Sequence, residues 1–261
     1  MKSMKLSKEI KISIALVAVP LVISFLLILL PVQEEYTARG EIAPVSDLGI
    51  NGSVHFTYVY SGIIENYLDK FYVFLEFDDV EFITLDDDEY EFYTEYYVGS
   101  DAEEDAYKEQ TVANAVHVTA SEIGEEDVFQ DKIDDILYHS AEYYGDSMGL
   151  MVAIGLVEEM NNVDYSRHGS LTIAGTGTLE YDGTVGSIGA VKQKLFTAAA
   201  NDVDIFFIPK DEDIYGMYSN ESEARQVLRE ENLDLNVVPV ETLDDAIEYL
   251  ENYDTGKVLL Q

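Results

Sequence analysis

The 261-residue sequence contains no cysteine, which excludes disulfide bonds and thiolate metal sites and leaves the redox compartment open. Basic residues are also scarce: 15 lysines and arginines stand against 52 aspartates and glutamates, for a formal net charge of −37. A surface this negative repels nucleic acid and anionic lipid. We therefore expect neither as a partner of the main domain.

Two common motifs are absent as well. The sequence has no GxxxxGK[ST] loop, so we expect no ATPase module, and it has no HExxH zinc motif. Its four histidines show no metal-ligand spacing and are interpreted as scattered, satisfied side chains: His55, His117, His139 and His168. The sequence therefore predicts neither a cofactor nor a metal.

The acidity alone does not indicate disorder. Hydrophobic residues make up 47% of the chain, with 19 tyrosines and 11 phenylalanines, so a real core can form. We expect a folded protein with a strongly hydrated acidic surface. Such a surface suits a high-salt, halophilic habitat, where salt screens the repulsion between like charges.

The N-terminus predicts a membrane anchor. Residues 1–11 form a basic tail with four lysines and one glutamate, and residues 12–32 carry no charge. Roughly 20 apolar residues cross a hydrocarbon core of about 30 Å. The lysines should stay in the cytoplasm, which places everything after residue 33 outside a single-pass anchor in the cytoplasmic membrane. A cleaved signal peptide is the alternative, but its apolar region is usually only about 7–15 residues long.

Residues 33–108 form an acidic, aromatic-rich section that we expect to be mainly β-structure. Strands are predicted within 36–62, and acidic and aromatic residues alternate over 71–98, which favours a sheet with one solvated face. The run DDDEY at 86–90 is a candidate for a divalent cation site. It lacks the glycine and the spacing of a calcium loop, so a solvated acidic loop is the favoured interpretation.

Residues 109–261 alternate between helical and strand patterns, which predicts an α/β or α+β domain. Asp182-Gly183 between β-prone segments predicts a hairpin. We expect strands at 204–209 and 235–240. Helices are expected at 111–124, ending at Gly124, and at 147–160, 189–201, 221–232 and 242–252, the last capped by Thr242.

The segment YYGDSMGL, residues 143–150, allows two interpretations of Ser147. Asp146 or Ser147 is an ordinary helix N-cap, or Ser147 is a nucleophile whose developing oxyanion is stabilised by the amides at the positive end of the helix. In the second case Gly145 and Gly149 leave room for a substrate backbone.

Several bases are available to such a nucleophile. A Ser-His-Asp triad can be written with His139 or His168, but nothing in the sequence selects either histidine. A lysine can replace the histidine if burial lowers its pKa to roughly 7–8. Lys192 and Lys194 follow the glycine-rich hairpin and are both candidates.

Two sequence blocks resemble the proteolytic domain of Lon proteases, and most closely the membrane-anchored, ATP-independent Lon-like proteases of bacteria. The first block is GDSMGLMVAIGL, and the second is AGTGTLEYDGTVGSIGAVKQKLFTAAANDVDIFFIPK. The lysine pattern of the family matches from Thr176 to Lys194 without a gap, with Ala190 at one of its glycines. The resemblance covers roughly residues 110 to 250.

The resemblance implies an α/β Lon-like catalytic section over 109–261 that hydrolyses peptide bonds with a Ser-Lys dyad. Ser147 would be the nucleophile and Lys194 the base, with Thr176 orienting the amine and Asp146 in a supporting position. On a helical wheel Lys192 is a rival, because it lies nearer to apolar neighbours; the family pattern selects Lys194.

Departures from the family lead to further expectations. Met148 replaces the usual alanine and is expected to narrow the site. Ser147 follows Gly124 by only 23 positions, too few for the PDZ domain that bacterial relatives often carry. We expect flexible or unfolded protein substrates and, as in many Lon relatives, assembly into a ring. The alternative function is a non-catalytic binding or scaffold protein on a Lon-like fold.

Overall fold

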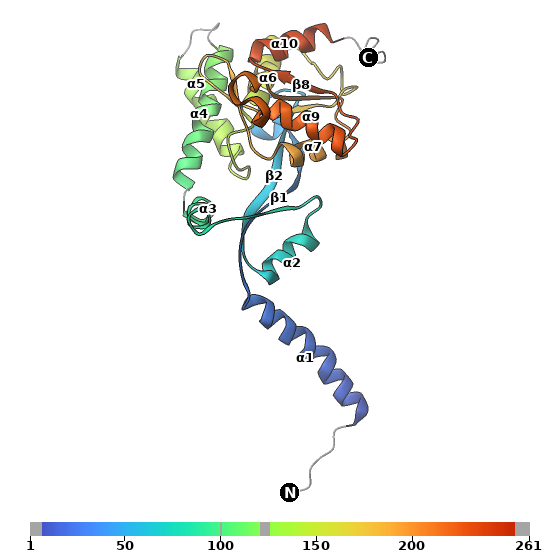
Figure 1. Cartoon of the computed structure of the whole chain (residues 1–261). Coiled ribbons are helices and arrows are strands. Elements are labelled where there is room, and N and C mark those ends of the chain that lie inside the picture. The colour runs from blue at the N-terminus through green and yellow to red at the C-terminus, as the bar shows by residue number, and fades with distance from the viewer. Residues whose placement is uncertain (1–6, 100, 121–125, 254–261) are drawn as a thin grey trace. The chain divides into compact units, whose positions relative to one another are not determined.

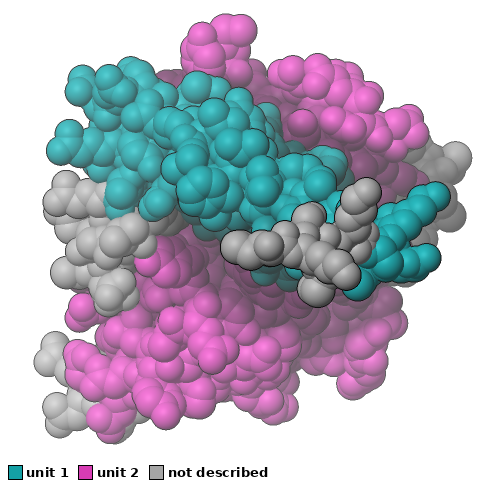
Figure 2. Space-filling model, turned by 90° about the horizontal axis from the view of Figure 1, so that it is seen from below, with its two compact units in different colours: residues 1–38, 61–99 teal, residues 39–60, 100–261 magenta. Residues whose placement is uncertain are grey.

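The computed structural model describes residues 7–99, 101–120 and 126–253. The chain divides into two compact units, which Figure 2 distinguishes by colour: unit 1 contains residues 1–38 and 61–99, and unit 2 contains residues 39–60 and 100–261. Two long strands, β1 (Pro31–Pro44) and β2 (His55–Asn66), each contribute residues to both units.

Unit 1 begins with α1 (Lys8–Ile28), the dark blue helix of Figure 1. The hydroxyl of Ser7 accepts a hydrogen bond from the Ile10 amide at 3.4 Å, and the helix therefore begins four residues before the predicted 12–32. None of its side chains is buried, and it is long and apolar enough to cross a membrane.

The rest of unit 1 contains α2 (Tyr67–Glu76), β3 (Glu81–Thr84) and α3 (Asp87–Gly99). β3 pairs antiparallel with the first part of β1, so that Thr84 lies opposite Glu34. The sheet that we predicted over 71–98 is therefore mostly helix, with β3 as its one strand among the described residues.

Side-chain caps at the starts of α2 and α3 explain why this stretch is mostly helical. The side chain of Asn66 accepts hydrogen bonds from the amides of Leu68 and Asp69 and begins α2. Asp86 accepts from the Glu89 amide at 2.9 Å, and Glu89 accepts from the Asp86 amide at 3.0 Å. This reciprocal capping box begins α3, and the acidic run 86–90 lies at the positive end of a helix instead of in a loop.

Unit 2 is built on a sheet with the strand order β1-β2-β4-β7-β8, in which β4 is Ile173–Gly175, β7 is Ile205–Pro209 and β8 is Val237–Val240. Its pairs β2–β4, β4–β7 and β7–β8 are all parallel. Residues of β7 alternate between two cores: Ile205 and Phe207 belong to the larger, and Phe206 and Ile208 to the smaller. Helices therefore cover both faces of this sheet.

The larger core includes residues of α4 (Asp101–Ala120), α5 (Glu126–His139), α6 (Gly149–Asn161) and α10 (Leu243–Asn252). The smaller core includes residues of α7 (Val191–Ala200) and α9 (Asn220–Glu230). The short turns η1 (Val45–Leu48), α8 (Glu212–Tyr215) and η2 (Gly216–Tyr218) complete the unit. The predicted α/β class is confirmed.

Local predictions in this unit are largely confirmed. β5 (Thr178–Leu179) and β6 (Val185–Gly186) form the antiparallel hairpin around Asp182-Gly183, and Thr242 caps α10 in a capping box. Helix α5 was not predicted. The predicted helix end at Gly124 lies outside the described residues.

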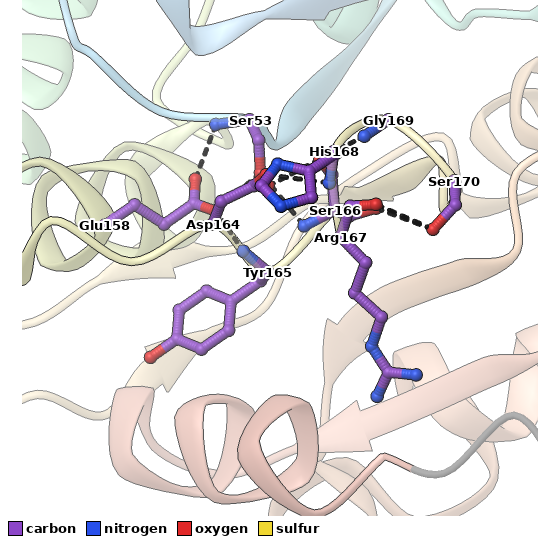
Figure 3. A network of polar contacts seen from close by, with 9 residues as sticks. All are labelled: Ser53, Glu158, Asp164, Tyr165, Ser166, Arg167, His168, Gly169 and Ser170. Atoms are coloured by element: carbon purple, nitrogen blue, oxygen red, sulfur yellow. Dashed lines mark hydrogen bonds and ion pairs between the residues drawn. The ribbon is translucent and has the colours of Figure 1, made fainter.

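A buried carboxylate holds the C-terminal end of α6 (Figure 3). Glu158 accepts hydrogen bonds from the amide and the hydroxyl of Ser53, both at 2.5 Å, and from the Tyr165 amide at 2.8 Å. In the same network Asp164 accepts from the Ser166 hydroxyl at 2.6 Å. These bonds tie α6 to the loop before β2 and fix the helix whose opposite end follows Ser147.

Candidate active site

Ser147 lies in a turn just before α6. The helix begins at Gly149, two residues later than predicted, and Met148 occupies the N-cap position, where no side chain caps the helix. Ser147 and Asp146 are therefore not ordinary N-caps. The carbonyl of Ser147 accepts from the Gly177 amide at 2.8 Å, and the Leu150 amide donates to the Gly177 carbonyl at 3.0 Å. This pair of bonds holds the serine turn against the segment between β4 and β5.

The amine of Lys194 reaches this turn from α7. Its Nζ lies 2.9 Å from Ser147 Oγ and 3.0 Å from Thr176 Oγ1. The Lys194 side chain is only 4% exposed, and Thr176 is fully buried. The Thr176 hydroxyl also donates to the Ser147 carbonyl at 3.2 Å. The structure thus brings together Ser147, Lys194 and Thr176 from three different segments.

Burial changes the chemistry of this amine. Loss of solvation lowers the pKa of Lys194 from 10.5 to about 7, and the nearby carboxylate of Asp146 opposes part of that shift. This shift makes the uncharged amine far more accessible at neutral pH than it is for an exposed lysine. An uncharged amine beside a hydroxyl can accept its proton, which is what a general base requires.

Lys192 lies elsewhere. Its Nζ is 3.9 Å from a Glu231 carboxylate oxygen and 5.9 Å from the centre of the Phe196 ring. Val191, Leu195 and Ala198 pack into the smaller core, and Lys194 is buried on the same helix. The helical wheel placed Lys192 nearer to apolar neighbours. A wheel cannot show which side of the helix faces the Ser147 turn.

A second polar network positions the start of α7. Ser187 donates to the buried carboxylate of Asp211 at 2.6 Å, and Asp211 also accepts from the Asn220 amide at 2.8 Å. The side-chain amide of Asn220 accepts from Ile188 N and donates to Ile188 O, both at 2.8 Å. No local sequence pattern marks Asp211 or Asn220, because both meet the lysine block only through the tertiary fold.

Ala190 occupies the N-cap of α7 in a left-handed conformation, with φ 57° and ψ 39°. Its carbonyl accepts from the Lys194 amide at 3.1 Å. Glycine adopts this conformation without steric cost, which explains the glycine of the family pattern at this position.

Two expectations about the serine turn are not met. Gly149 does not leave room for a substrate, because a Cβ atom there would lie 2.2 Å from Thr111 Oγ1 and 2.9 Å from the Leu179 amide nitrogen. The glycine instead permits close packing of α6 on α4 and β5. Met148, expected to narrow the site, is 3% exposed and packs into the larger core.

The two histidines considered for a triad, His139 and His168, each pair with an aspartate. His139 Nε2 lies 3.6 Å from Asp135, and His168 Nδ1 lies 3.3 Å from Asp164. Neither contacts Ser147 among the interactions of the described residues. Within the same residues, no group of three or more histidine, aspartate or glutamate side chains is placed to hold a metal ion.

A comparison with curated proteins found no match to this chain. A family model does match: the Lon protease (S16) C-terminal proteolytic domain, over residues 104–251. The matched span is more than half of the 261 residues and contains Ser147, Thr176 and Lys194. The chain therefore belongs to the family of Lon protease (S16) C-terminal proteolytic domains and carries a Lon-type serine peptidase domain.

Proposed function

We propose that this protein is a membrane-anchored, ATP-independent serine endopeptidase that uses Ser147 and Lys194 as a catalytic dyad. The observation that carries the proposal is the 2.9 Å separation of Lys194 Nζ and Ser147 Oγ, with the amine buried and its pKa lowered to about 7.

In the proposed reaction, neutral Lys194 accepts the proton of the Ser147 hydroxyl as Oγ attacks the scissile carbonyl. The resulting ammonium returns a proton to the leaving amine as the peptide C–N bond breaks, which leaves an acyl-enzyme on Ser147. Water, deprotonated by Lys194, then hydrolyses the ester and restores the serine.

Thr176 and Asp146 assist the lysine in this scheme. Thr176 accepts one N–H of Lys194 and is itself held by the Ser147 carbonyl, so it orients the amine toward Oγ. The Asp146 carboxylate raises the pKa of Lys194 against the effect of burial, and this keeps the amine basic enough to take a proton.

Backbone amides are the proposed oxyanion donors. The amides of Gly149 and Leu150 already donate to the carbonyls of Asp146 and Gly177. The amides of Ser147 and Met148 have no acceptor among the described parts of the chain, and they lie at the positive end of α6. We assign the oxyanion to these two amides.

The proposed location is the outer side of the cytoplasmic membrane. Helix α1 would span the bilayer, with the four lysines of residues 1–11 in the cytoplasm. The 261 residues contain no GxxxxGK[ST] loop, which supports proteolysis without ATP and limits substrates to flexible or unfolded proteins. Assembly into a ring is part of this proposal.

The test is cleavage of a fluorescently labelled unfolded protein such as casein by the purified full chain in detergent and high salt. Ser147→Ala and Lys194→Ala should each abolish cleavage while the far-UV circular dichroism spectrum stays unchanged. Lys192→Ala is the matched control, because it removes the other lysine of α7 and should retain activity. Equal cleavage by wild type and both dyad variants would reject the dyad, and an absence of cleavage by the wild type would favour a binding or scaffold role.

A further inference from the structure

Helix α2 in unit 1 turns its apolar side outward. Tyr67, Phe71, Phe74 and Leu75 follow the spacing i, i+4, i+7 and i+8, which places them on one side of the helix. We call these four residues the α2 stripe. They are 48 to 67% exposed, whereas Val73 on another side is buried. Because an amphipathic helix normally buries its apolar side, the α2 stripe requires something to cover it.

The start of α2 is attached to the end of α1. The Tyr67 amide donates to the carbonyl of Leu30 at 3.2 Å, two residues beyond the end of α1 at Ile28. The two helices also contact one another within unit 1 (Figure 1). The 21 residues of α1 span about 32 Å at 1.5 Å per residue, close to the thickness of a hydrocarbon core. Tyr67 therefore lies where a membrane-spanning α1 would leave the bilayer.

Polar contacts beside the α2 stripe hold α2 onto the strands of unit 1. Lys70 forms an ion pair with Glu34 of β1, and its Nζ lies 4.5 Å from the centre of the Phe82 ring of β3. The side chain of Asn66 caps the helix. These contacts, with Val73 buried on the side away from the stripe, fix the rotation of α2 about its axis and leave the α2 stripe exposed.

We propose that α2 is an interfacial helix that lies on the outer surface of the bilayer spanned by α1, with the α2 stripe inserted among the lipid headgroups. The inference rests on the proposed membrane anchor. Tyrosine and phenylalanine suit this region, where an aromatic ring meets both water and hydrocarbon. Asp69, Glu76, Asp78 and Asp79 lie in or just after α2 and favour neutral over anionic lipid.

The absence of tryptophan provides a direct test, because one introduced tryptophan is the only one in the protein. The full chain would be reconstituted in phosphatidylcholine vesicles whose acyl chains are brominated at known depths. Phe71→Trp and Phe74→Trp should show blue-shifted emission and quenching by shallow bromines, at a depth of about 5–10 Å. Glu76→Trp, on the opposite side of α2, should be quenched less and should respond more to aqueous iodide.

Val17→Trp, near the middle of α1, separates the failure of this inference from the failure of the anchor. If Val17→Trp is quenched by deep bromines while Phe71→Trp and Phe74→Trp respond to iodide alone, the anchor stands and the interfacial helix is rejected. Blue-shifted emission at residues 71 and 74 without bromine quenching would also reject it, because protein would then cover the stripe. Lack of quenching at Val17→Trp would reject both the anchor and the interfacial helix.

Discussion

The hydroxyl of Thr176 accepts a hydrogen bond from the Nζ of Lys194 at 3.0 Å, deep in unit 2 where both side chains are buried. Through the bond from the same hydroxyl to the Ser147 carbonyl, the orientation of the amine is linked to the position of Ser147. This relationship, together with the neighbouring residues, leads to four predictions.

The first prediction concerns Thr176 itself. Thr176→Val keeps the volume but removes the bond to the amine, so kcat should fall about 10- to 100-fold, equivalent to about 1.5–3 kcal/mol. KM should change little, because Thr176 is fully buried and does not meet substrate. Thr176→Ser keeps the hydroxyl and should recover most of the activity. Steady-state kinetics on a peptide substrate give kcat and KM for each variant. Equal activities of Thr176→Ser and Thr176→Val would contradict an orienting role.

The second prediction concerns pH. In the proposed mechanism the neutral amine is the base, so kcat/KM should rise with pH through the Lys194 pKa of about 7 and level off above it. The Asp146 carboxylate raises that pKa, so Asp146→Asn should move the rising limb to lower pH. A pH–rate profile for each protein measures the shift. A limb that stays in place or moves to higher pH would show that Asp146 does not act on the amine in this way.

The third prediction concerns backbone strain at Ala190. A left-handed conformation costs an alanine roughly 1–2 kcal/mol, so Ala190→Gly should raise the free energy of unfolding by about 1 kcal/mol after the added chain entropy is deducted. Ala200→Gly, at the exposed end of the same helix, is the control and should be destabilising. Chemical denaturation measures the free energy of unfolding of both variants. A loss of stability in Ala190→Gly would contradict strain at Ala190.

The fourth prediction concerns Met148. Its side chain is buried in the larger core, so Met148→Ala, which installs the residue of the family pattern, should cost about 2–5 kcal/mol of stability. Activity per folded molecule should stay close to wild type. The two effects can be measured separately by denaturation and by active-site titration with a serine-reactive probe. An unchanged stability with faster cleavage would instead support the view that Met148 narrows the site.

Local patterns were sufficient for much of unit 2. The hairpin at Asp182-Gly183, the cap at Thr242 and the strand over 204–209 depend on turn chemistry, capping and short apolar runs, all of which are local. The stretch 71–98 was predicted wrongly as sheet, because its aromatic and acidic residues alternate in a way that also fits helices. The D-x-x-E signal of Asp86 and Glu89 was present in the sequence and marks the start of α3.

The sequence by itself determined the apolar N-terminal helix, the α/β class and, through two family-like blocks, the residues of the proposed serine peptidase site. The family pattern already selected Lys194 over Lys192. Only the tertiary structure decided that Lys194 is buried with its amine at the Ser147 turn, and that Met148 and Gly149 belong to the packing of the core. The physical reason is that burial and desolvation depend on which elements pack together. The lowered pKa of Lys194 arises from the way α7 packs in unit 2 and from no feature of the lysine block alone.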